Sequence, residues 1–323
     1  MKNYYKDKKV LVTGADGFIG FHLTERLVAC GADVSVFVRA NSTTGTNMLR
    51  LKNISHLTSK LKTIIAADIG SRDATELIKK EKPRIIFHLA ADAYVNRSFK
   101  QPREVIRTNV DGTINVLHAC LDENGKPADW VERIVCTSSS EIYGHHEEPI
   151  DESFELKPSS PYGASKAAAD RIAFSYFNTF GLPVAIIRPF NTYGPRHTYD
   201  APPKFIALAL ADKDITIYGD GTQTRDLSYV DDTVEGFLTM GFHKEAEGEA
   251  VNFGTGKDTS IKDLAQKIIT LSGSTSKIVH VAPRLAEVQR LCSNPSKAKK
   301  LFGWKAGISL EEGLRRNIAW MKQ

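Results

Sequence analysis

The sequence contains few cysteines, and they lie far apart. Cys30, Cys120, Cys136 and Cys292 form no CxxC pair, which argues against a disulfide framework and a zinc site. We expect all four to be buried structural thiols. We expect no metal site, because the side chains of His145 to Glu148 diverge along a polar loop and cannot converge on one ion.

Long apolar runs are also missing. No stretch approaches the roughly 20 apolar residues that cross a bilayer, and the polar start MKNYYKDKKV lacks the apolar core of a secretory signal. We therefore expect no membrane association and a cytoplasmic location. Lys and Arg (43) exceed Asp and Glu (38) without forming a basic block, which favours small anionic molecules over nucleic acid as partners.

Short apolar runs, by contrast, recur through the first 190 residues. They read KVLVTG, DVSVFV, KTIIAAD, RIIFHLA, RIVCTSS and PVAIIRP. Their Val and Ile content, with both faces apolar, is typical of buried parallel strands, and helix-like segments separate them. The alternation predicts an α/β fold with a doubly wound, Rossmann-type parallel sheet.

The pattern changes after Pro189. Turn residues become frequent, strand-like runs shorten, and helical stretches such as PKFIALALAD and SIKDLAQKIITLSG are separated by loops. We predict a dinucleotide-binding domain over residues 1–190 that also receives part of 226–254. A smaller C-terminal α/β lobe over 191–323 would bind the substrate.

Three glycines follow the first predicted strand. VLVTGADGFIG places Gly14, Gly17 and Gly20 between that strand and a helix. Such glycines allow a tight turn and close approach of the backbone to a pyrophosphate, whose charge is stabilised by the helix N-terminus. The GxxGxxG spacing is weak evidence alone, but its strand and helix context indicates a dinucleotide site.

The second predicted strand ends in FVRANSTTG. Arg39 stands where an acidic residue would accept the hydroxyls of the adenine ribose, and a guanidinium suits a ribose 2′-phosphate. This favours NADP as the cofactor and leaves NAD open. The alternative is an arginine that only faces solvent.

A tyrosine and a lysine occur four residues apart in SPYGASKAAAD. This spacing places Tyr162 and Lys166 on one face of a helix. A nearby ammonium lowers the pKa of a phenol, so the tyrosine could act as a base toward a sugar hydroxyl. The pair alone would more often be accidental, but it follows TSSSEIYG, which carries Ser139 and Glu141.

With these motifs, the chain resembles the extended short-chain dehydrogenase/reductases of the nucleotide-sugar epimerase and dehydratase family. The resemblance continues through FHLAADAYVNRS, TNVDGTINVLHAC, RPFNTYGPR, IYGDGTQTRDLSYVDD, NFGTG and SLEEGLRRNIAW. It implies a tightly held nicotinamide cofactor, a nucleotide-diphosphate hexose as substrate, and a homodimer packed through helices.

The resemblance also implies roles for individual residues. Ser139 matches the hydroxyl that binds the sugar near its 4-hydroxyl, Tyr162 the base, and Lys166 its partner. The implied cofactor-binding residues are Gly14, Gly17, Phe18, Ile19, Gly20, Arg39, Asp68, Ile69, Leu89, Ala90, Ala91, Tyr162, Lys166 and Pro189.

On the substrate side, Pro189, Phe190 and Asn191 match the segment between nicotinamide and sugar. Arg225 and Arg284 match arginines that hold the diphosphate, a role for which their forked donors are suited. The alternative for each arginine is a structural ion pair.

Glu141 distinguishes the reactions of this family. All begin with oxidation at C4, but a 4,6-dehydratase also needs a base for the C5 proton. Related epimerases usually carry an uncharged residue at this position, whereas dehydratases carry Glu. The dTDP-glucose dehydratase pattern has an Asp where this chain has Ser140, so the closer resemblance is to GDP-mannose-type or N-acetylhexosamine-type dehydratases.

We therefore predict a nucleotide-sugar 4,6-dehydratase with Ser139, Glu141, Tyr162 and Lys166 as catalytic residues. A 4-epimerase, then a nucleotide-uronate decarboxylase, and finally a dinucleotide-binding protein without catalysis stay open as alternatives. No motif encodes the nucleotide base or the sugar.

Overall fold

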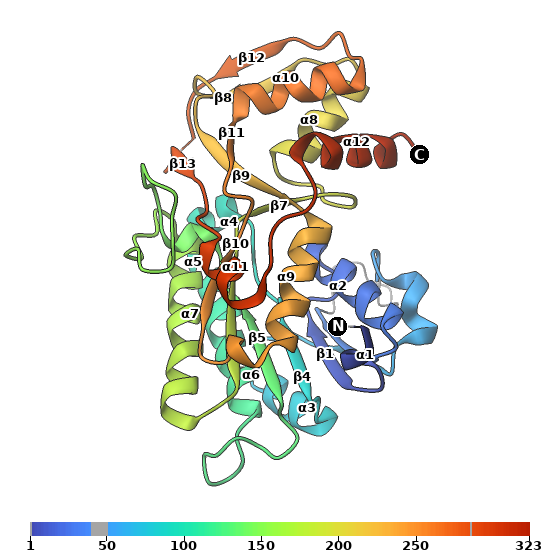
Figure 1. Ribbon diagram of the computed structural model, residues 1–323, viewed down its shortest axis with the longest axis vertical. Coiled ribbons are helices and arrows are strands. Elements are labelled where there is room, and N and C mark those ends of the chain that lie inside the picture. Colours follow the sequence, from blue (N-terminus) through green and yellow to red (C-terminus); the bar gives the residue numbers. More distant parts are fainter. Residues whose placement is uncertain (1, 40–50, 285) are drawn as a thin grey trace. The chain divides into compact units, whose positions relative to one another are not determined.

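The structure is a computed structural model that describes residues 2–39, 51–284 and 286–323 (Figure 1). It divides into two compact units. The first unit comprises Met1–Ile142, Ser160–Arg188 and Val234–Val251, and the second comprises Tyr143–Ser159, Pro189–Thr233 and Asn252–Gln323. The chain thus enters each unit three times, and residues 143–159 group with the second unit, where Ile150 bridges to Ser293.

The first unit is built on a seven-stranded sheet with the order β10-β6-β5-β4-β1-β2-β3. On either side of β1, Val10 pairs in parallel with Val34 of β2 and Ile85 of β4. This order reverses beside β1, as in doubly wound folds, and confirms the predicted Rossmann sheet. The strands are β1 Lys9–Thr13, β2 Asp33–Val38, β3 Thr63–Ala66, β4 Ile85–His88, β5 Arg133–Thr137, β6 Val184–Pro189 and β10 Ala250–Phe253.

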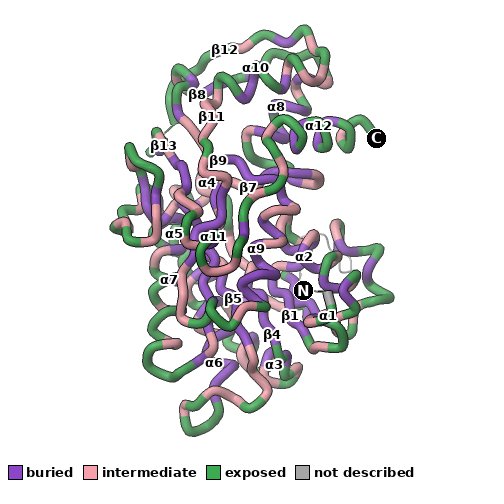
Figure 2. Tube along the Cα trace, viewed as in Figure 1, coloured by how far each residue is buried: buried purple, intermediate pink, exposed green. Residues whose placement is uncertain are grey.

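The central strands are buried on both faces (Figure 2). Leu11, Ile86 and Ile134 belong to a core shared with Val116 and Ala173 from helices on one face. On the other face the Tyr5 hydroxyl donates to the Leu238 carbonyl at 2.6 Å. Full burial of each large aliphatic side chain contributes about 1.5–3 kcal/mol, so the apolar runs are sufficient to fix the sheet.

Helices of the first unit connect consecutive strands. A π-helical turn, η3, interrupts the α5–α6 segment, and short 3-10 turns complete the unit. The elements are α1 Lys2–Tyr5, α2 Phe18–Ala29, η2 Ser55–Lys60, α3 Asp73–Glu81, α4 Val95–Lys100, α5 Pro102–Ile106, η3 Arg107–Asp111, α6 Gly112–Ala119, η4 Ser140–Ile142, α7 Pro161–Phe180, α9 Val230–Phe242 and η5 Lys244–Ala246.

The second unit has shorter elements. Its central strand β9 pairs antiparallel with β11 and in parallel with β13 and β7, and β8 pairs with β12. The Asp226 carboxylate on β9 accepts from the Thr255, Gly256 and Ser293 backbone amides at 2.9–3.1 Å. The elements are β7 Asn191–Tyr193, α8 Ala201–Leu210, β8 Ile215–Tyr218, β9 Thr224–Tyr229, β11 Asp258–Ser260, α10 Ile261–Ser272, β12 Ile278–Val281, β13 Arg290–Leu291, α11 Ser296–Phe302 and α12 Leu310–Met321.

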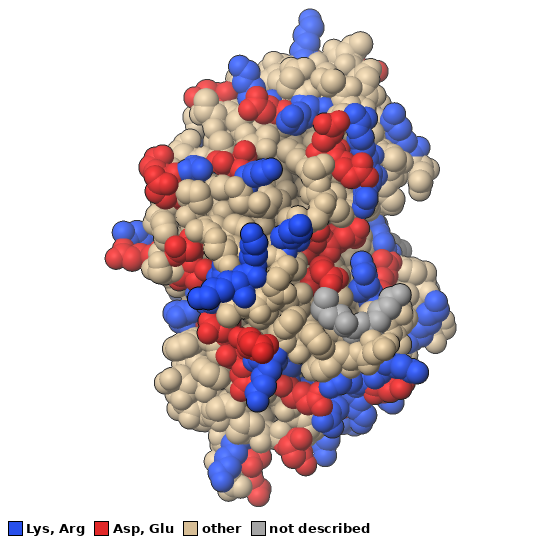
Figure 3. Space-filling view, viewed as in Figure 1, with Lys and Arg blue, Asp and Glu red and all other residues tan. Residues whose placement is uncertain are grey.

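Several predicted absences can be compared with the described residues. All four cysteines are free and buried there, and no group of three or more His, Cys, Asp or Glu side chains could hold a metal ion. No helix in the described ranges has both the length and the apolar character required to span a bilayer. Basic and acidic side chains are interspersed over the visible face (Figure 3).

Candidate active site

The glycine loop between β1 and α2 is a tight turn packed closely against neighbouring backbone. Gly14 adopts φ +70°, and a Cβ there would lie 2.8 Å from the Ala90 backbone nitrogen. A Cβ on Gly20 would lie 2.2 Å from the Gly14 carbonyl oxygen. Since side chains at these positions would collide with backbone, only glycine allows this tight turn between β1 and the N-terminus of α2, the arrangement that dinucleotide-binding loops use.

A buried chain of hydrogen bonds connects the start of this loop to the end of β4. The Thr13 hydroxyl oxygen accepts from the Leu89 and Ala90 backbone amides at 3.1 Å and lies 2.8 Å from His88 Nδ1. His88 Nε2 lies 3.1 Å from the Thr113 hydroxyl. Burial lowers the His88 pKa to about 3, so the ring is neutral at neutral pH and joins the ends of β1 and β4 without a charge.

Arg39 and Asp68 meet at the ends of β2 and β3. The Asp68 carboxylate accepts from Arg107 Nη2 at 2.8 Å and lies 3.7 Å from Arg39 Nη2, and it also accepts from the Gly70 amide at 2.9 Å. Asn41 and Ser42, which follow Arg39 in the motif, lie outside the described residues. Two arginines therefore surround the position expected for the adenine end of the cofactor, and Arg107 was not anticipated from the sequence.

Ser139 and Glu141 follow β5, with Ser139 just before the short turn η4 and Glu141 within it. Ser139 is buried, and its hydroxyl oxygen accepts from the Glu141 backbone amide at 3.2 Å. The neighbouring Thr137 hydroxyl is buried without a hydrogen-bond partner among the described residues. The carboxyl end of a central parallel strand is where ligands bind in open α/β sheets, so these groups lie at the position expected for chemistry.

Tyr162 and Lys166 lie on the first turns of α7. The Ser160 hydroxyl caps this helix by accepting from the Gly163 amide at 3.0 Å, and Pro161 occupies its first position. Both active-site candidates are buried, at 9% and 5% exposure. Lys166 Nζ donates to the Thr137 carbonyl at the end of β5, which brings the α7 pair to the strand that leads into Ser139.

The environment of Lys166 changes its acidity. Burial lowers the pKa of its ammonium to about 8, and the electrostatic influence of Cys136 and Asp170 opposes that shift. The side chain is therefore mostly charged at neutral pH and titrates just above it. Groups with such shifted pKa values cluster at functional sites.

Asn109 is a second residue that sequence reasoning did not assign. Its side chain lies in the π-helical turn η3, donates to the Ser165 hydroxyl at 2.9 Å, and accepts from the Asp92 amide at 2.7 Å. π-Helical turns often occur at functional sites. Here the turn fastens α7, next to Lys166, to the loop after β4.

The candidate substrate residues of the second unit begin at the end of β6. Pro189 is its last residue, Phe190 is buried, and Asn191 begins β7. The Asn191 side-chain oxygen is buried and has no hydrogen-bond partner among the described residues. An unpaired buried amide oxygen is costly, and this one is available to a ligand donor.

The two candidate diphosphate arginines differ in their surroundings. Arg225 donates to the Val288 carbonyl at 2.7 Å and to Glu287 Oε1 at 2.8 Å. Arg284 is exposed, and its guanidinium carbon lies 4.2 Å from the centre of the Tyr218 ring. Arg225 is thus part of an internal ion pair, whereas Arg284 is held by an aromatic face and keeps its donors available.

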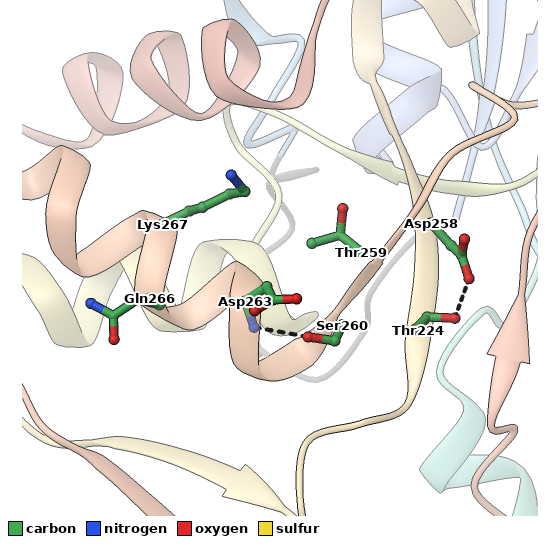
Figure 4. Close-up of a pocket in the computed structure, with 7 residues that line it drawn as sticks. All are labelled: Thr224, Asp258, Thr259, Ser260, Asp263, Gln266 and Lys267. Atoms are coloured by element: carbon green, nitrogen blue, oxygen red, sulfur yellow. Dashed lines mark hydrogen bonds between the residues drawn. The ribbon is translucent and has the colours of Figure 1, made fainter.

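A polar groove also lies in the second unit, between β11 and the start of α10 (Figure 4). Asp258 accepts from the Thr224 hydroxyl at 2.5 Å, and the Ser260 hydroxyl caps α10 by accepting from the Asp263 amide at 3.0 Å. None of the residues predicted to bind cofactor or substrate lines it. Two of its side chains already have structural partners: Asp258 joins β11 to β9 through Thr224, and Ser260 caps α10.

Comparison with known proteins agrees with the site described above. The profile of the family described as GDP-mannose 4,6 dehydratase matches residues 11–317, nearly the whole chain. The chain belongs to the nucleotide-sugar epimerase and dehydratase family of extended short-chain dehydrogenase/reductases. It is therefore an enzyme of an NAD-dependent family, and the resemblance predicted from the motifs is confirmed.

Relatives within the family catalyse different reactions. The chain is 34% identical over 98% of its length to the trifunctional UDP-glucose 4,6-dehydratase/UDP-4-keto-6-deoxy-D-glucose 3,5-epimerase/UDP-4-keto-L-rhamnose-reductase of Arabidopsis thaliana, of which it spans 47%. It is 33% identical to a UDP-N-acetyl-alpha-D-glucosaminuronate decarboxylase of Bacillus cytotoxicus, with 98% of each chain covered. The chain spans about half the length of the plant relatives it matches.

Solved family structures include enzymes with NAD bound. The dTDP-glucose 4,6-dehydratase DesIV of Streptomyces venezuelae, solved with NAD, has a TM-score of 0.86 and 30% identity and covers 97% of this chain and 96% of its own. The UDP-glucuronic acid 4-epimerase of Bacillus cereus, solved with UDP-glucuronic acid and NAD, has a TM-score of 0.85 and 30% identity over 98% and 99%. The fold is thus common to dehydratases and epimerases, so it cannot distinguish them.

Proposed function

We propose that this enzyme is a nucleotide-sugar 4,6-dehydratase, which converts a nucleotide-diphosphate hexose into a 4-keto-6-deoxy sugar nucleotide. The observation that carries the proposal is Glu141 in the turn after β5, with its amide bonded to the Ser139 hydroxyl. An epimerase needs no carboxylate there, whereas elimination of water across C5 and C6 requires a base near C5.

Each of the four candidate residues has a distinct task in this reaction. Tyr162 removes the proton of the sugar 4-hydroxyl, and Ser139 holds that hydroxyl by a hydrogen bond. Lys166 stabilises the phenolate by its charge. Glu141 then removes the C5 proton, acidified by the 4-keto group, and returns a proton to the departing 6-hydroxyl as water.

A nicotinamide cofactor suits the first unit, since Gly14 and Gly20 permit a tight backbone turn between β1 and the N-terminus of α2 that no residue with a Cβ could form without shifting the backbone. When bound, it would take hydride from C4 and return it to C6, with the proton that Tyr162 removed balanced by one returned to C5, so the overall reaction is redox-neutral and loses one water. Gly14, Gly17 and Gly20 would contact its pyrophosphate, and the Lys166 ammonium its ribose. Arg39 and Arg107 suit a 2′-phosphate, so we propose NADP as the preferred form.

On the substrate side, we propose that Asn191 and Arg284 bind the sugar nucleotide. The unpaired Asn191 oxygen can accept from a sugar hydroxyl, and Arg284 can donate to the diphosphate. Arg225 would join it by exchanging part of its ion pair with Glu287 for the phosphate oxygens.

The resemblance to family members also supports a cytoplasmic homodimer. Ile106 on α5 and Phe174 on α7 are large apolar residues with 46% and 39% exposure, on helices that pack together. Packing of this face against a second copy of the chain would remove both apolar side chains from water. Light scattering of the protein and of its Phe174→Glu variant tests this. The unaltered protein should be dimeric and the variant monomeric; if both are monomeric, the dimer proposal is wrong.

Mass spectrometry after incubation with UDP-, GDP- and dTDP-hexoses, with NAD or NADP supplied, tests the reaction itself. Loss of one water from a single substrate is the expected result and identifies that substrate. A new stereoisomer of unchanged mass would instead establish an epimerase, and loss of carbon dioxide from a uronate would establish a decarboxylase. Cofactor binding without turnover on any sugar would contradict all three.

A further inference from the structure

A row of three buried side chains lies at the carboxyl end of the first sheet. Thr13 of β1, His88 of β4 and Cys136 of β5 occupy neighbouring positions in the parallel register. Each lies two residues beyond a core residue of its own strand, so all three point to the face that α6 and α7 cover. His88 is 4% exposed, and the reaction steps above give it no role. A buried histidine thus lies beside the edge at which ligands bind in such sheets.

The hydrogen bonds of His88 specify which ring nitrogen carries the proton. The Thr113 hydroxyl donates to the Asn109 carbonyl at 2.7 Å, which uses its single proton. Its oxygen can therefore only accept from His88 Nε2, which lies 3.1 Å away. Nδ1 then has a lone pair and accepts from the Thr13 hydroxyl at 2.8 Å. The ring is thus neutral and protonated on Nε2.

The same hydrogen bonds exclude the charged form of the ring. The Thr13 oxygen accepts from the Leu89 and Ala90 amides at 3.1 Å each, which fills its two acceptor positions. A proton on His88 Nδ1 would therefore face an oxygen with no lone pair left to accept it. Burial, followed by the charge of Lys166, acts in the same direction and lowers the pKa of His88 to about 3.

On the Thr113 side, the hydrogen bonds continue to α7. Thr113 holds the Asn109 main chain, and the Asn109 side chain donates to the Ser165 hydroxyl at 2.9 Å. That hydroxyl donates in turn to the Tyr162 carbonyl at 2.7 Å. Asn109 and Ser165 are each 2% exposed, so water does not compete for these bonds. His88 therefore lies in the middle of a buried hydrogen-bond chain that begins at the glycine loop and ends on the first turn of α7.

We propose that His88 is a positioning residue of the active site, which in its neutral form connects the glycine loop to the helix that carries Tyr162 and Lys166. Through Thr13 it fixes the turn after β4 against the cofactor loop, and through Thr113 it fixes the segment that fastens α7. The inference rests on the proposed function insofar as that function assigns Tyr162 and Lys166 to the reaction. It adds a residue that need not touch substrate or cofactor and still affects cofactor binding and turnover.

Nitrogen-15 NMR of the histidine rings tests the proton arrangement without substrate or cofactor. The His88 signals, assigned by their loss in His88→Gln, should show a protonated Nε2 and an unprotonated Nδ1. They should stay unchanged between about pH 5 and 8, the range in which an ordinary histidine titrates. A His88 ring that titrates in this range, or that carries its proton on Nδ1, would overturn the proposal.

Two substitutions of His88 each keep one half of its hydrogen bonding. His88→Asn retains an acceptor near the position of Nδ1 for Thr13, and His88→Gln retains a donor near the position of Nε2 for Thr113. His88→Asn should lower kcat by about 10-fold, since displaced reacting groups react more slowly, and should change cofactor affinity little. His88→Gln should weaken cofactor binding by about 3–10-fold, the effect of a lost neutral hydrogen bond, with a smaller change in kcat.

Calorimetric titration with NAD and with NADP measures the affinity of these variants, and initial rates at saturating cofactor measure kcat. If both substitutions change affinity and kcat in the same proportion, His88 contributes only to packing and the proposal is overturned.

Substitutions of Thr113 separate its hydroxyl from its shape. Thr113→Val keeps the shape without the hydroxyl and should lower kcat by about 10-fold, whereas Thr113→Ser keeps the hydroxyl and should retain turnover. Cys136→Ala is the matched control, because it opens space in the same buried row without removing any of these hydrogen bonds. It should lower thermal stability and leave kcat unchanged. A loss of kcat in Cys136→Ala as large as in Thr113→Val would mean that core packing sets the rate, which contradicts the proposal.

The NMR and binding measurements keep the two proposals distinguishable. The expected ring proton and the weaker cofactor binding of His88→Gln, in a protein that acts on no sugar nucleotide, would support the role of His88 toward the glycine loop and refute the proposed function. Dehydration with a kcat that none of the His88 and Thr113 substitutions changes would overturn the role of His88 alone.

Discussion

The two units hold their candidate residues in different ways. In the first unit, Tyr162 and Lys166 lie on a capped helix of twenty residues, and Ser139 is the second residue after a central buried strand. In the second, Arg225 lies near the start of β9 and bonds to Glu287, while Arg284 lies in the segment after β12 and packs on Tyr218. The residues proposed for chemistry are thus held by one long helix and the end of a buried strand, and the two arginines proposed for the diphosphate by individual side-chain contacts.

This difference implies that substitutions in the two units change different properties of the enzyme. Substitutions of the catalytic candidates in the first unit should act mainly on kcat, because the proposed roles of these groups lie in the chemical steps. Substitutions in the second unit should act mainly on nucleotide affinity. The four predictions below test that division, beginning with the largest effect.

Tyr162→Phe should reduce turnover by about 10²–10⁴-fold, the usual contribution of a general base, while cofactor binding changes little. Single-turnover formation of the 4-keto product is the measurement. Tyr176→Phe, on the same helix, is the matched control and should retain turnover. Equal losses in both variants would mean that α7 packing, rather than the Tyr162 phenol, limits the rate.

Glu141→Gln should stop loss of water and leave oxidation at C4 measurable, since the amide cannot accept the C5 proton. Deuterium exchange at C5, read by mass spectrometry, should disappear as well. Glu147→Gln removes an exposed carboxylate from the following loop and should have no effect. Full dehydration activity in the Glu141→Gln variant would show that Glu141 is not the C5 base.

Arg225→Gln should weaken nucleoside-diphosphate binding by about 10–100-fold, in line with the loss of a charge-assisted hydrogen bond of about 1.5–3 kcal/mol, with a smaller change in kcat. Calorimetric titration with UDP, GDP and dTDP measures it. Glu287→Gln releases the same guanidinium and should keep or strengthen binding. If both variants lose stability equally and binding is unaffected in each, Arg225 is only a structural ion pair.

Ala286→Gly should stabilise the second unit by about 0.5–1 kcal/mol, because Ala286 adopts φ +52°, a conformation that glycine tolerates better. Chemical denaturation measures the change. Gly181→Ala in the first unit is the reverse control: its φ is +69° and nothing lies within 4 Å of an added Cβ, so it should destabilise by backbone strain alone. If Ala286→Gly lowers the free energy of unfolding instead, the restriction that alanine places on the unfolded chain outweighs the backbone strain at this position.

Much of the first unit could be predicted from the sequence. All six apolar runs became sheet strands, since Val- and Ile-rich segments that are apolar on both faces are stable only when covered on both sides. The glycine spacing predicted the tight turn for a local reason: Gly14 and Gly20 meet within one strand-turn-helix segment. Tyr162 and Lys166 could be paired because helical periodicity alone places them on one face.

Other features depend on contacts between distant segments, which no local pattern specifies. Arg107 meets Asp68, and Arg188 meets Asp170, only after the strands have assembled in the sheet. Likewise, the ion pair of Arg225 with Glu287 joins residues 62 positions apart. An arginine at a binding motif can therefore be recognised from the sequence, but its partner cannot.

The sequence by itself determined the strand and helix periods, the glycine turn and the family motifs, because each depends on residues within one or two neighbouring elements. Tertiary structure decided how charges are compensated: His88 is neutral, Asp170 is ionised and Lys166 titrates near 8. The physical reason is that burial and the distance between charges set a pKa, and both quantities exist only once the sheet and its helices have packed.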